Sequence, residues 1–109
     1  MHYELYISPS ALKELKKLDS NEKESIKTKL KLLALDPFNT SIGITQMKGK
    51  HQPIYYRIKS GDYRAIYHIE DKGIYVDKIG HRKNIKIFTG GFKHGDAGIL
   101  YGMGGELPF

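Results

Sequence analysis

The chain has 109 residues, 39% of them apolar, and this length supports one domain with a single modest core. Its formal net charge of +6 favours a nucleic-acid, ribosomal or acidic protein partner over a neutral one. The absence of cysteine excludes disulfides and thiolate metal sites and is compatible with a reducing cytoplasm. No apolar run has the length of a signal peptide or a membrane span, so we expect a cytoplasmic protein that does not bind a membrane.

The positive charge of the chain is unevenly distributed. Residues 1–45 carry seven lysines against six acidic residues, whereas residues 46–88 carry ten lysines or arginines against four acidic residues. Residues 89–109 carry one lysine against two acidic residues. A basic protein must place its lysines somewhere, but the concentration of the excess charge in one segment favours a polyanionic partner.

The N-terminal third of the chain predicts a short strand followed by two helices. Residues 3–7 alternate between two sets of side chains, as expected of a strand with one buried face. Ser8 is a suitable N-cap for a helix with Pro9 at its first position, and Asp19 begins a second helix that ends at Asp36. The helix lysines are interleaved with acidic residues, which indicates an ordinary solvated surface; contact with ribosomal RNA is the alternative.

Residues 54–82 predict a meander of three antiparallel strands that collects arginines and lysines. The first connection contains Ser60 and Gly61, a pair typical of a two-residue hairpin turn. With that turn, Arg57 would lie directly opposite Arg64. Directly paired residues point to the same face of a sheet, and like charges in such a pair cost stability. The pair therefore predicts a binding site for a polyanion.

The second connection of the meander is predicted at Asp71 and Lys72. It would pair Arg64 with Ile79, so the segment that ends at Arg82 would emerge at the same edge as the first hairpin. We therefore expect three arginines from distant positions in the sequence to converge there.

The side chains of residues 54–59 alternate between an apolar set, which includes Ile58, and a set formed by Tyr55, Arg57 and Lys59. This alternation predicts a sheet with one apolar face beneath the helices and one basic, aromatic face toward solvent. The predicted fold class is α+β, with an N-terminal strand, a helix hairpin and an antiparallel meander of three to four strands.

The order of these elements, with the segments YRIKSGDYRAIYHIED and IGHRKNI, resembles the RelE/ParE toxin superfamily of type II toxin–antitoxin systems. The resemblance covers residues 1–88, the expected toxin domain, and leaves residues 89–109 as a Gly-rich C-terminal tail. RelE-like members are ribosome-dependent endoribonucleases that cut mRNA, whereas ParE-like members inhibit DNA gyrase. The resemblance implies a fold similar to the predicted one and leaves both targets open.

A RelE-like function implies cleavage of mRNA by attack of a 2′-OH group on the adjacent phosphorus, without a metal or another cofactor. By the resemblance, Arg64 and Arg82 match the arginines that stabilise the phosphate, and Arg57 and Lys59 match two basic residues on the second strand. Arginine suits this role because it binds phosphate oxygens bidentately and stays protonated. Lys59 is either the acceptor of the nucleophile's proton or a ligand of the backbone phosphate.

The sequence departs from the family pattern after the closing arginine. RelE-like enzymes often have a tyrosine shortly after that position, where this chain has Lys86 and Phe88. Phe88 can stack on a base but has no hydroxyl that exchanges a proton. His81 is then the candidate for this proton transfer, because imidazole titrates near neutrality. The alternative is a histidine that merely follows the turn glycine Gly80.

The remaining candidate residues are basic or aromatic side chains that would hold RNA. They are Lys48, Lys50, Tyr55, Lys83, Lys86 and Phe88. The resemblance further implies a cognate RelB-like antitoxin, the ribosome with its mRNA, and promoter DNA bound through the toxin–antitoxin complex as partners. A ParE-like gyrase inhibitor and a basic RNA- or DNA-binding module without catalytic activity are the alternatives.

The tail, residues 89–109, contains seven glycines. Because glycine raises the entropy cost of ordering a chain, disorder is one expectation for this segment. The other is that its apolar side chains dock in a groove that an antitoxin would otherwise fill.

Overall fold

The computed structural model describes residues 3–47, 54–85 and 99–101. In these residues the elements follow in the order β1, α1, α2, a short 3₁₀ helix η1, and then β2 to β6. The helices are α1 (Pro9–Lys16), α2 (Ser20–Leu35) and η1 (Thr40–Ile42). The strands are β1 (Glu4–Ile7), β2 (Ile44–Gln46), β3 (Tyr55–Ser60), β4 (Tyr63–Glu70), β5 (Gly73–His81) and β6 (Ile99–Tyr101).

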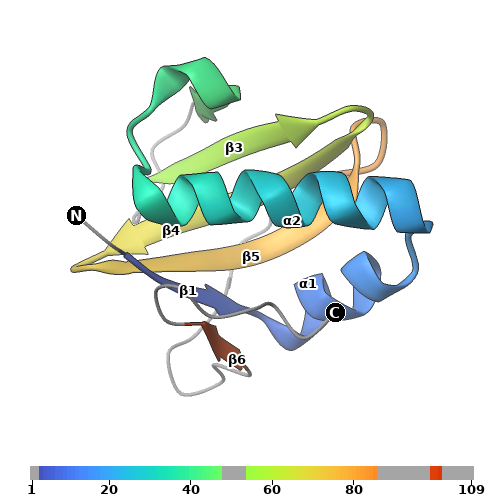
Figure 1. Cartoon of the computed structure of the whole chain (residues 1–109), viewed down its shortest axis with the longest axis horizontal. Coiled ribbons are helices and arrows are strands. Elements are labelled where there is room, and N and C mark those ends of the chain that lie inside the picture. Colours follow the sequence, from blue (N-terminus) through green and yellow to red (C-terminus); the bar gives the residue numbers. More distant parts are fainter. Residues whose placement is uncertain (1–2, 48–53, 86–98, 102–109) are drawn as a thin grey trace.

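The six strands of the described residues form one sheet in the spatial order β2-β3-β4-β5-β1-β6. Strands β2 to β5 pair antiparallel in sequence order, and β1 pairs parallel with β5 beside this meander. Figure 1 shows α2 lying over the meander and α1 near β5, so both helices cover the same face of the sheet. The predicted α+β class, with an N-terminal strand, a helix hairpin and an antiparallel meander, is confirmed.

Both long helices begin where the sequence places an N-cap. The Ser8 hydroxyl accepts a hydrogen bond from the backbone N–H of Ala11 at 3.0 Å, and Pro9 occupies the first turn of α1. The Asp19 carboxylate accepts a hydrogen bond from the backbone N–H of Glu22 at 2.9 Å at the start of α2. These contacts confirm the two predicted helix starts.

One apolar core lies between the helices and the sheet. Its buried side chains come from β1, β3, β4, β5, α1, α2 and η1, and they are Leu5, Ile7, Ala11, Leu15, Ile26, Leu30, Leu33, Ile42, Ile58, Ala65, Tyr67, Ile74, Val76 and Ile79. Full burial of a large apolar side chain contributes roughly 1.5–3 kcal/mol, so this core holds the two layers together. Within the described residues, the hydroxyl of Tyr67 is buried without a hydrogen-bond partner, and burial raises its pKa above the ordinary tyrosine value.

The turn between β3 and β4 differs from the predicted one by one residue. Gly61 and Asp62 occupy this turn, and Gly61 adopts a φ of +60°, which glycine tolerates without steric cost. Lys59, not Arg57, therefore lies directly opposite Arg64. The predicted Arg57–Arg64 pair was wrong, because the glycine takes the first of the two central turn positions rather than the second.

The pairing of β4 with β5 follows the predicted register only as far as a β-bulge. The pair of Tyr67 with Val76 belongs to the predicted register, whereas the next pair joins Ile66 with Lys78. Strand β5 therefore contributes one extra residue, Asp77, between these two pairs.

The bulge changes which residues of β5 share a face with the side chains of β4. Gly80 lies opposite Arg64, and Ile79 lies opposite Ala65. The predicted pair of Arg64 with Ile79 was wrong, because regular alternation gives no sign of an extra residue in a strand. Ile79 is instead 1% exposed and belongs to the core.

Three residues of the predicted tail form β6, which pairs antiparallel with β1 at the edge of the sheet. Tail residues 89–98 and 102–109 lie outside the described residues. In the part of the chain that the structure describes, no helix combines the length and the apolar character needed to cross a membrane.

Candidate functional site

The candidate residues gather on the face of the sheet that is turned away from the helices. On β3, Arg57 and Lys59 flank Ile58, which is buried in the core, so both cationic side chains project from the opposite face. Arg64 and Ile66 on β4 are paired directly with them and share that face. One row across the sheet therefore contains Lys59 and Arg64, and the next row contains Arg57 and Ile66.

The row of Lys59 and Arg64 has a glycine on each side. The backbone N–H of Lys59 donates to the carbonyl oxygen of Gly43 at 3.3 Å, and Gly80 lies opposite Arg64 on β5. Gly43 adopts a φ of +87°, a conformation that other residues rarely adopt. Neither glycine carries a side chain that would cover the two cations.

The backbone of the β3–β4 turn positions two arginines. Nη1 of Arg64 donates to the carbonyl oxygens of Gly61 and Tyr63, both at 2.9 Å. The backbone N–H of Arg82 donates to the carbonyl oxygen of Asp62 at 2.7 Å, and Nε of Arg82 lies 3.4 Å from Oδ1 of the same residue. The side chains of Arg82 and Asp62 are 54% and 64% exposed, so solvent screening limits their ion pair to at most about 1 kcal/mol. The contacts place Arg82 at the same edge of the sheet as the hairpin, as predicted.

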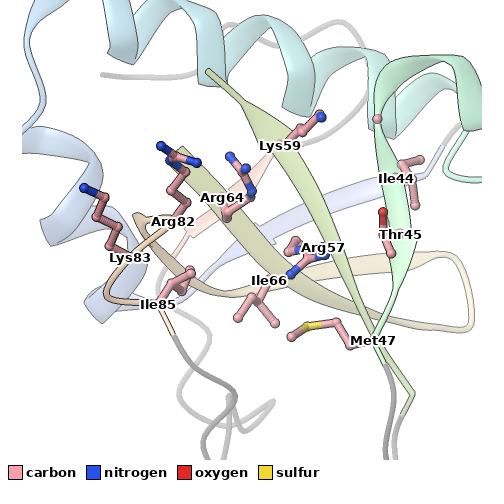
Figure 2. A pocket seen from close by; sticks show the side chains of 11 residues that line it. Ile44, Thr45, Met47, Arg57, Lys59, Arg64, Ile66, Arg82, Lys83 and Ile85 are labelled. Carbon is pink, nitrogen blue, oxygen red and sulfur yellow. The ribbon is translucent and has the colours of Figure 1, made fainter. Parts of the chain in front are cut away.

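A pocket of about 560 Å³ lies on this face of the sheet (Figure 2). Its cationic lining residues are Arg57, Lys59, Arg64, Arg82 and Lys83. Its other lining residues are Gly43, Ile44, Thr45, Met47, Ile66 and Ile85, and we call the whole site the basic pocket. Among the described residues, no Asp or Glu lines it, and no three His, Asp or Glu side chains anywhere gather in a way that could hold a metal ion.

The basic pocket has two parts of different chemistry. In Figure 2 the guanidinium groups of Arg64 and Arg82 point in the same direction, whereas the apolar side chains of Met47, Ile66 and Ile85 lie together at the other side. Guanidinium groups bind phosphate oxygens bidentately, and an apolar wall suits the flat face of an unstacked base. The arrangement therefore suits a ligand that carries both a phosphate and a ring.

His81 lies outside the lining of the basic pocket. It is paired directly with Tyr63, which packs against the core, and the centroids of the two rings are 5.4 Å apart. Nδ1 of His81 accepts a hydrogen bond from the backbone N–H of Lys83 at 3.1 Å. The structure thus brings Lys83 to the pocket and places the His81 ring on the other face of the sheet from Arg64.

Tyr55 lies on the same face as the basic pocket but outside its lining. It is paired with His68, and the edge-to-face contact of their rings has a centroid distance of 5.7 Å. Burial and the nearby Asp77 carboxylate raise the pKa of the Tyr55 hydroxyl, which therefore stays protonated at neutral pH. The other predicted RNA-binding residues, Lys48, Lys50, Lys86 and Phe88, lie outside the described residues.

The apolar part of the basic pocket was missed by the sequence reasoning. The alternation along β4 was the available signal for Ile66, because it follows Arg64 by two residues and residues two apart in a strand point to the same face. Nothing in the sequence marks Met47 or Ile85, since their place in the lining depends on the path of the chain after β2 and after β5.

Comparison with known proteins shows which family the chain is similar to. A family model described as the ParE toxin of the type II toxin–antitoxin system parDE matches residues 5–85. Curated protein sequences gave no match.

Solved toxin structures share the fold. A chain of the archaeal RelE–RelB complex from Pyrococcus horikoshii OT3 is 25% identical with a TM-score of 0.67, and the match covers 78% of this chain and 100% of that one. A free-state E. coli RelE mutant is 30% identical with a TM-score of 0.61, and the match covers 76% and 86% of the two chains. A chain of the intact E. coli RelBE complex is 32% identical with a TM-score of 0.58, covering 72% and 95%. The family match and these structures together show that the chain belongs to the RelE/ParE superfamily, the toxins of type II toxin–antitoxin systems.

Proposed function

We propose that this toxin is a ribosome-dependent endoribonuclease that cleaves mRNA at the basic pocket. The observation that carries the proposal is the direct pairing of Lys59 with Arg64, next to Arg82, in a pocket without an acidic lining residue in the described part of the chain. Like charges in a direct cross-strand pair cost stability. Phosphate oxygens bound between them would remove this repulsion, so the pair suits a polyanion.

In the proposed reaction, the 2′-oxygen forms a bond to the adjacent phosphorus while the bond from phosphorus to the 5′-oxygen breaks. The products are a 2′,3′-cyclic phosphate and a 5′-hydroxyl. Arg64 and Arg82 stabilise the negative charge that develops on the phosphorus-bound oxygens, and Arg57 holds the RNA backbone.

Two proton transfers accompany this reaction. Lys59, whose side chain lines the basic pocket, is assigned the proton of the attacking 2′-OH in the neutral amine form of its side chain; as an ammonium it binds phosphate, which is its alternative role. The leaving 5′-oxygen takes up a proton from solvent water, so that a 5′-hydroxyl is released. His81, the other candidate for proton transfer, would reach the pocket only after its ring turns away from Tyr63.

The apolar part of the basic pocket supports single-stranded RNA as the ligand. Met47 and Ile85, both half-buried, provide an apolar surface for one base beside the cations that would bind the phosphate, and Ile66, which is 2% exposed, lies beneath them. Proteins that recognise single-stranded RNA bind bases that are splayed out of the stack. Lys83 would contact a neighbouring phosphate, and Lys48, Lys50, Tyr55, Lys86 and Phe88 remain the further candidates for RNA contacts.

An antitoxin partner is part of the proposal. Similar RelE toxins from Pyrococcus horikoshii, Methanococcus jannaschii and E. coli have been solved as complexes with RelB. We therefore propose a RelB-like antitoxin for this chain, and binding of promoter DNA through the resulting complex.

Inhibition of DNA gyrase is the second candidate function. It is favoured by the family model, which describes the ParE toxin and matches residues 5–85. A gyrase inhibitor would leave mRNA intact and would change the supercoiling of plasmid DNA in a purified gyrase reaction.

The deciding experiment maps mRNA 5′ ends in a translation reaction that contains the purified protein, with and without ribosomes. We expect cuts that require ribosomes and disappear in the Arg64→Ala variant. Lys13→Ala, which changes an exposed residue of α1, is the control and should cut like the parent. An mRNA left uncut by the parent protein, together with altered supercoiling by gyrase, would contradict the endoribonuclease and favour the second candidate.

A further inference from the structure

The β-bulge at Asp77 decides which side chains of β5 face the basic pocket. Side chains alternate along a strand with a period of two, so one extra residue turns all the following side chains to the other face. Without the bulge, Ile79 would lie opposite Arg64, and Gly80 would lie opposite Tyr63. A bulky apolar side chain would then leave the core and stand beside Arg64. The bulge thus keeps this side of the pocket free of a large side chain.

A buried contact holds the side chain of the bulged residue. Nδ1 of His68 lies 2.7 Å from Oδ2 of Asp77, and the two side chains are 4% and 1% exposed. The Nδ1–H group donates to the carboxylate, since an ionised carboxylate only accepts. The His68 ring is itself held, because it stacks on Tyr75 with a centroid distance of 5.1 Å and an interplanar angle of 12°. A carboxylate buried to this degree is costly without such a donor, so the contact favours the bulged conformation.

A second contact holds the backbone of the bulge. A bulged residue is left out of the regular ladder, and its backbone groups need other partners. The Ser8 hydroxyl donates to the carbonyl oxygen of Asp77 at 3.0 Å, and the backbone N–H of Ser8 donates to the carbonyl oxygen of Val76 at 3.0 Å. Ser8 also caps α1, so the start of this helix and the bulge share one residue.

We propose that His68 and Asp77 are positioning residues for the basic pocket. Their contact stabilises the bulge. The bulge decides which side chains of β5 face the pocket, and it places Gly80 opposite Arg64, two residues before Arg82. Neither residue lines the pocket itself. The consequence for RNA cleavage rests on the proposed function, whereas the effect on the pairing of β5 does not.

Engineered cysteine pairs can report the register of β5 directly. The chain contains no cysteine, so a disulfide can form only between the introduced residues. Directly opposed residues have Cα atoms about 4.5–5.5 Å apart, which lies within the range that a disulfide spans. Tyr63→Cys with His81→Cys reports the bulged register, because these residues are paired in the structure. Tyr63→Cys with Gly80→Cys reports the register without the bulge. Each pair is introduced into the full chain, oxidised with diamide, and quantified by mass spectrometry without reduction.

The contact is removed by the double variant His68→Phe/Asp77→Ala in each cysteine background. This variant leaves neither member buried without its partner, and the phenylalanine keeps a ring that stacks on Tyr75. We expect the yield of the 63–81 disulfide to fall at least tenfold and the 63–80 disulfide to appear. Asp77→Asn keeps an oxygen that accepts from Nδ1 of His68 and should retain the parent pattern. Tyr6→Phe is the matched control, because Tyr6 also stacks on the ring of Tyr75, with a centroid distance of 4.6 Å, and this change leaves His68 and Asp77 in place.

Equal 63–81 disulfide yields in the parent and the double variant would overturn the proposal. A double variant that fails to fold by circular dichroism would also overturn it, since the contact would then stabilise the whole fold rather than the register of β5 against β4. RNA cleavage is measured with the same variants without the cysteines, and we expect at least a tenfold loss in the double variant only. Cleavage at the parent rate after the register has changed would break the link to the pocket. If the parent cleaves no RNA, the proposed function fails, and the disulfide yields still decide the positioning role.

Discussion

Lys59 and Arg64 lie directly opposite each other on β3 and β4, and both side chains line the basic pocket. Stable sheets favour opposite charges or apolar pairs at such positions, because like charges that face each other are destabilising. A protein keeps such a pair when a ligand needs it, and stability is then traded against function. The toxin is therefore expected to become more stable and less active when one charge of the pair is removed.

Replacing Lys59 by a neutral residue tests whether the like-charge pair lowers stability and supports activity. We expect Lys59→Gln to raise the free energy of unfolding by about 0.2–1 kcal/mol, since it removes one like-charge pair. Ribosome-dependent cleavage should fall at least tenfold. Urea unfolding and mapped mRNA cleavage measure the two effects. Lys72→Gln in the exposed turn between β4 and β5 should change neither quantity, and a Lys59→Gln protein that is less stable than the parent would contradict the expectation.

Arg64→Lys separates charge from geometry at the same pair. Lysine keeps the positive charge, but it lacks the planar fork that binds two phosphate oxygens at once. We expect kcat to fall about 100-fold, the size of effect seen when one transition-state donor is lost, with little change in KM. Steady-state cleavage kinetics on ribosome-bound mRNA provide the measurement. A variant that changes only KM would show that Arg64 binds the substrate without acting in the transition state.

The position of His81 predicts a weaker effect than that of Lys59. In the structure the ring packs on Tyr63, and Nδ1 accepts from the N–H of Lys83. Glutamine also offers an oxygen that accepts from that N–H, so His81→Gln should cleave mRNA within about threefold of the parent. A loss of about 100-fold, with a changed pH profile of kcat near neutrality, would instead assign proton transfer to His81.

The space beside Arg64 can be filled in steps at Gly80. A Cβ atom at this position would lie 3.5 Å from Cβ of Ile85, an ordinary van der Waals distance. Gly80→Ala should therefore fold and gain up to about 1 kcal/mol of stability, because glycine in a strand costs conformational entropy. Gly80→Leu should fold but cover Arg64 and reduce cleavage at least tenfold. Full loss of cleavage in Gly80→Ala would show that the site needs glycine for a reason other than space.

Tyr67 makes stability depend on pH in the alkaline range. Burial raises the pKa of its hydroxyl in the folded protein, so the unfolded chain loses this proton at a lower pH than the folded one. The free energy of unfolding is therefore not reduced by this group below the ordinary tyrosine pKa. Above that pH it falls by about 1.4 kcal/mol per pH unit for one such group.

Removing the hydroxyl with Tyr67→Phe tests this origin. At neutral pH the variant should be equal to the parent in stability or up to about 1 kcal/mol more stable, because no buried hydroxyl is left without a partner. Its advantage should grow when urea unfolding is repeated at about pH 11, well above the ordinary tyrosine pKa. A difference in unfolding free energy that stays constant between the two pH values would exclude Tyr67 as the source.

Several features of this toxin were determined by the sequence alone, because they depend on residues that are close together in the chain. Ser8 and Asp19 cap the two helices through bonds to backbone groups three residues away. The alternation around Ile58 placed Arg57 and Lys59 on the exposed face of β3. The resemblance to the RelE/ParE superfamily rests on the same local segments, and the family match confirms it.

The pairing of the basic residues was decided only by the tertiary structure. One residue of difference in the β3–β4 turn made Lys59, not Arg57, the partner of Arg64. The extra residue in β5 is held by His68 on the neighbouring strand and by Ser8, which lies 69 positions away in the sequence. Hydrophobic alternation cannot reveal such a bulge, because it records which side chains are apolar and not which backbone groups find distant partners. The face of each cation was thus set by local pattern, whereas its neighbours in the basic pocket were set by contacts between distant parts of the chain.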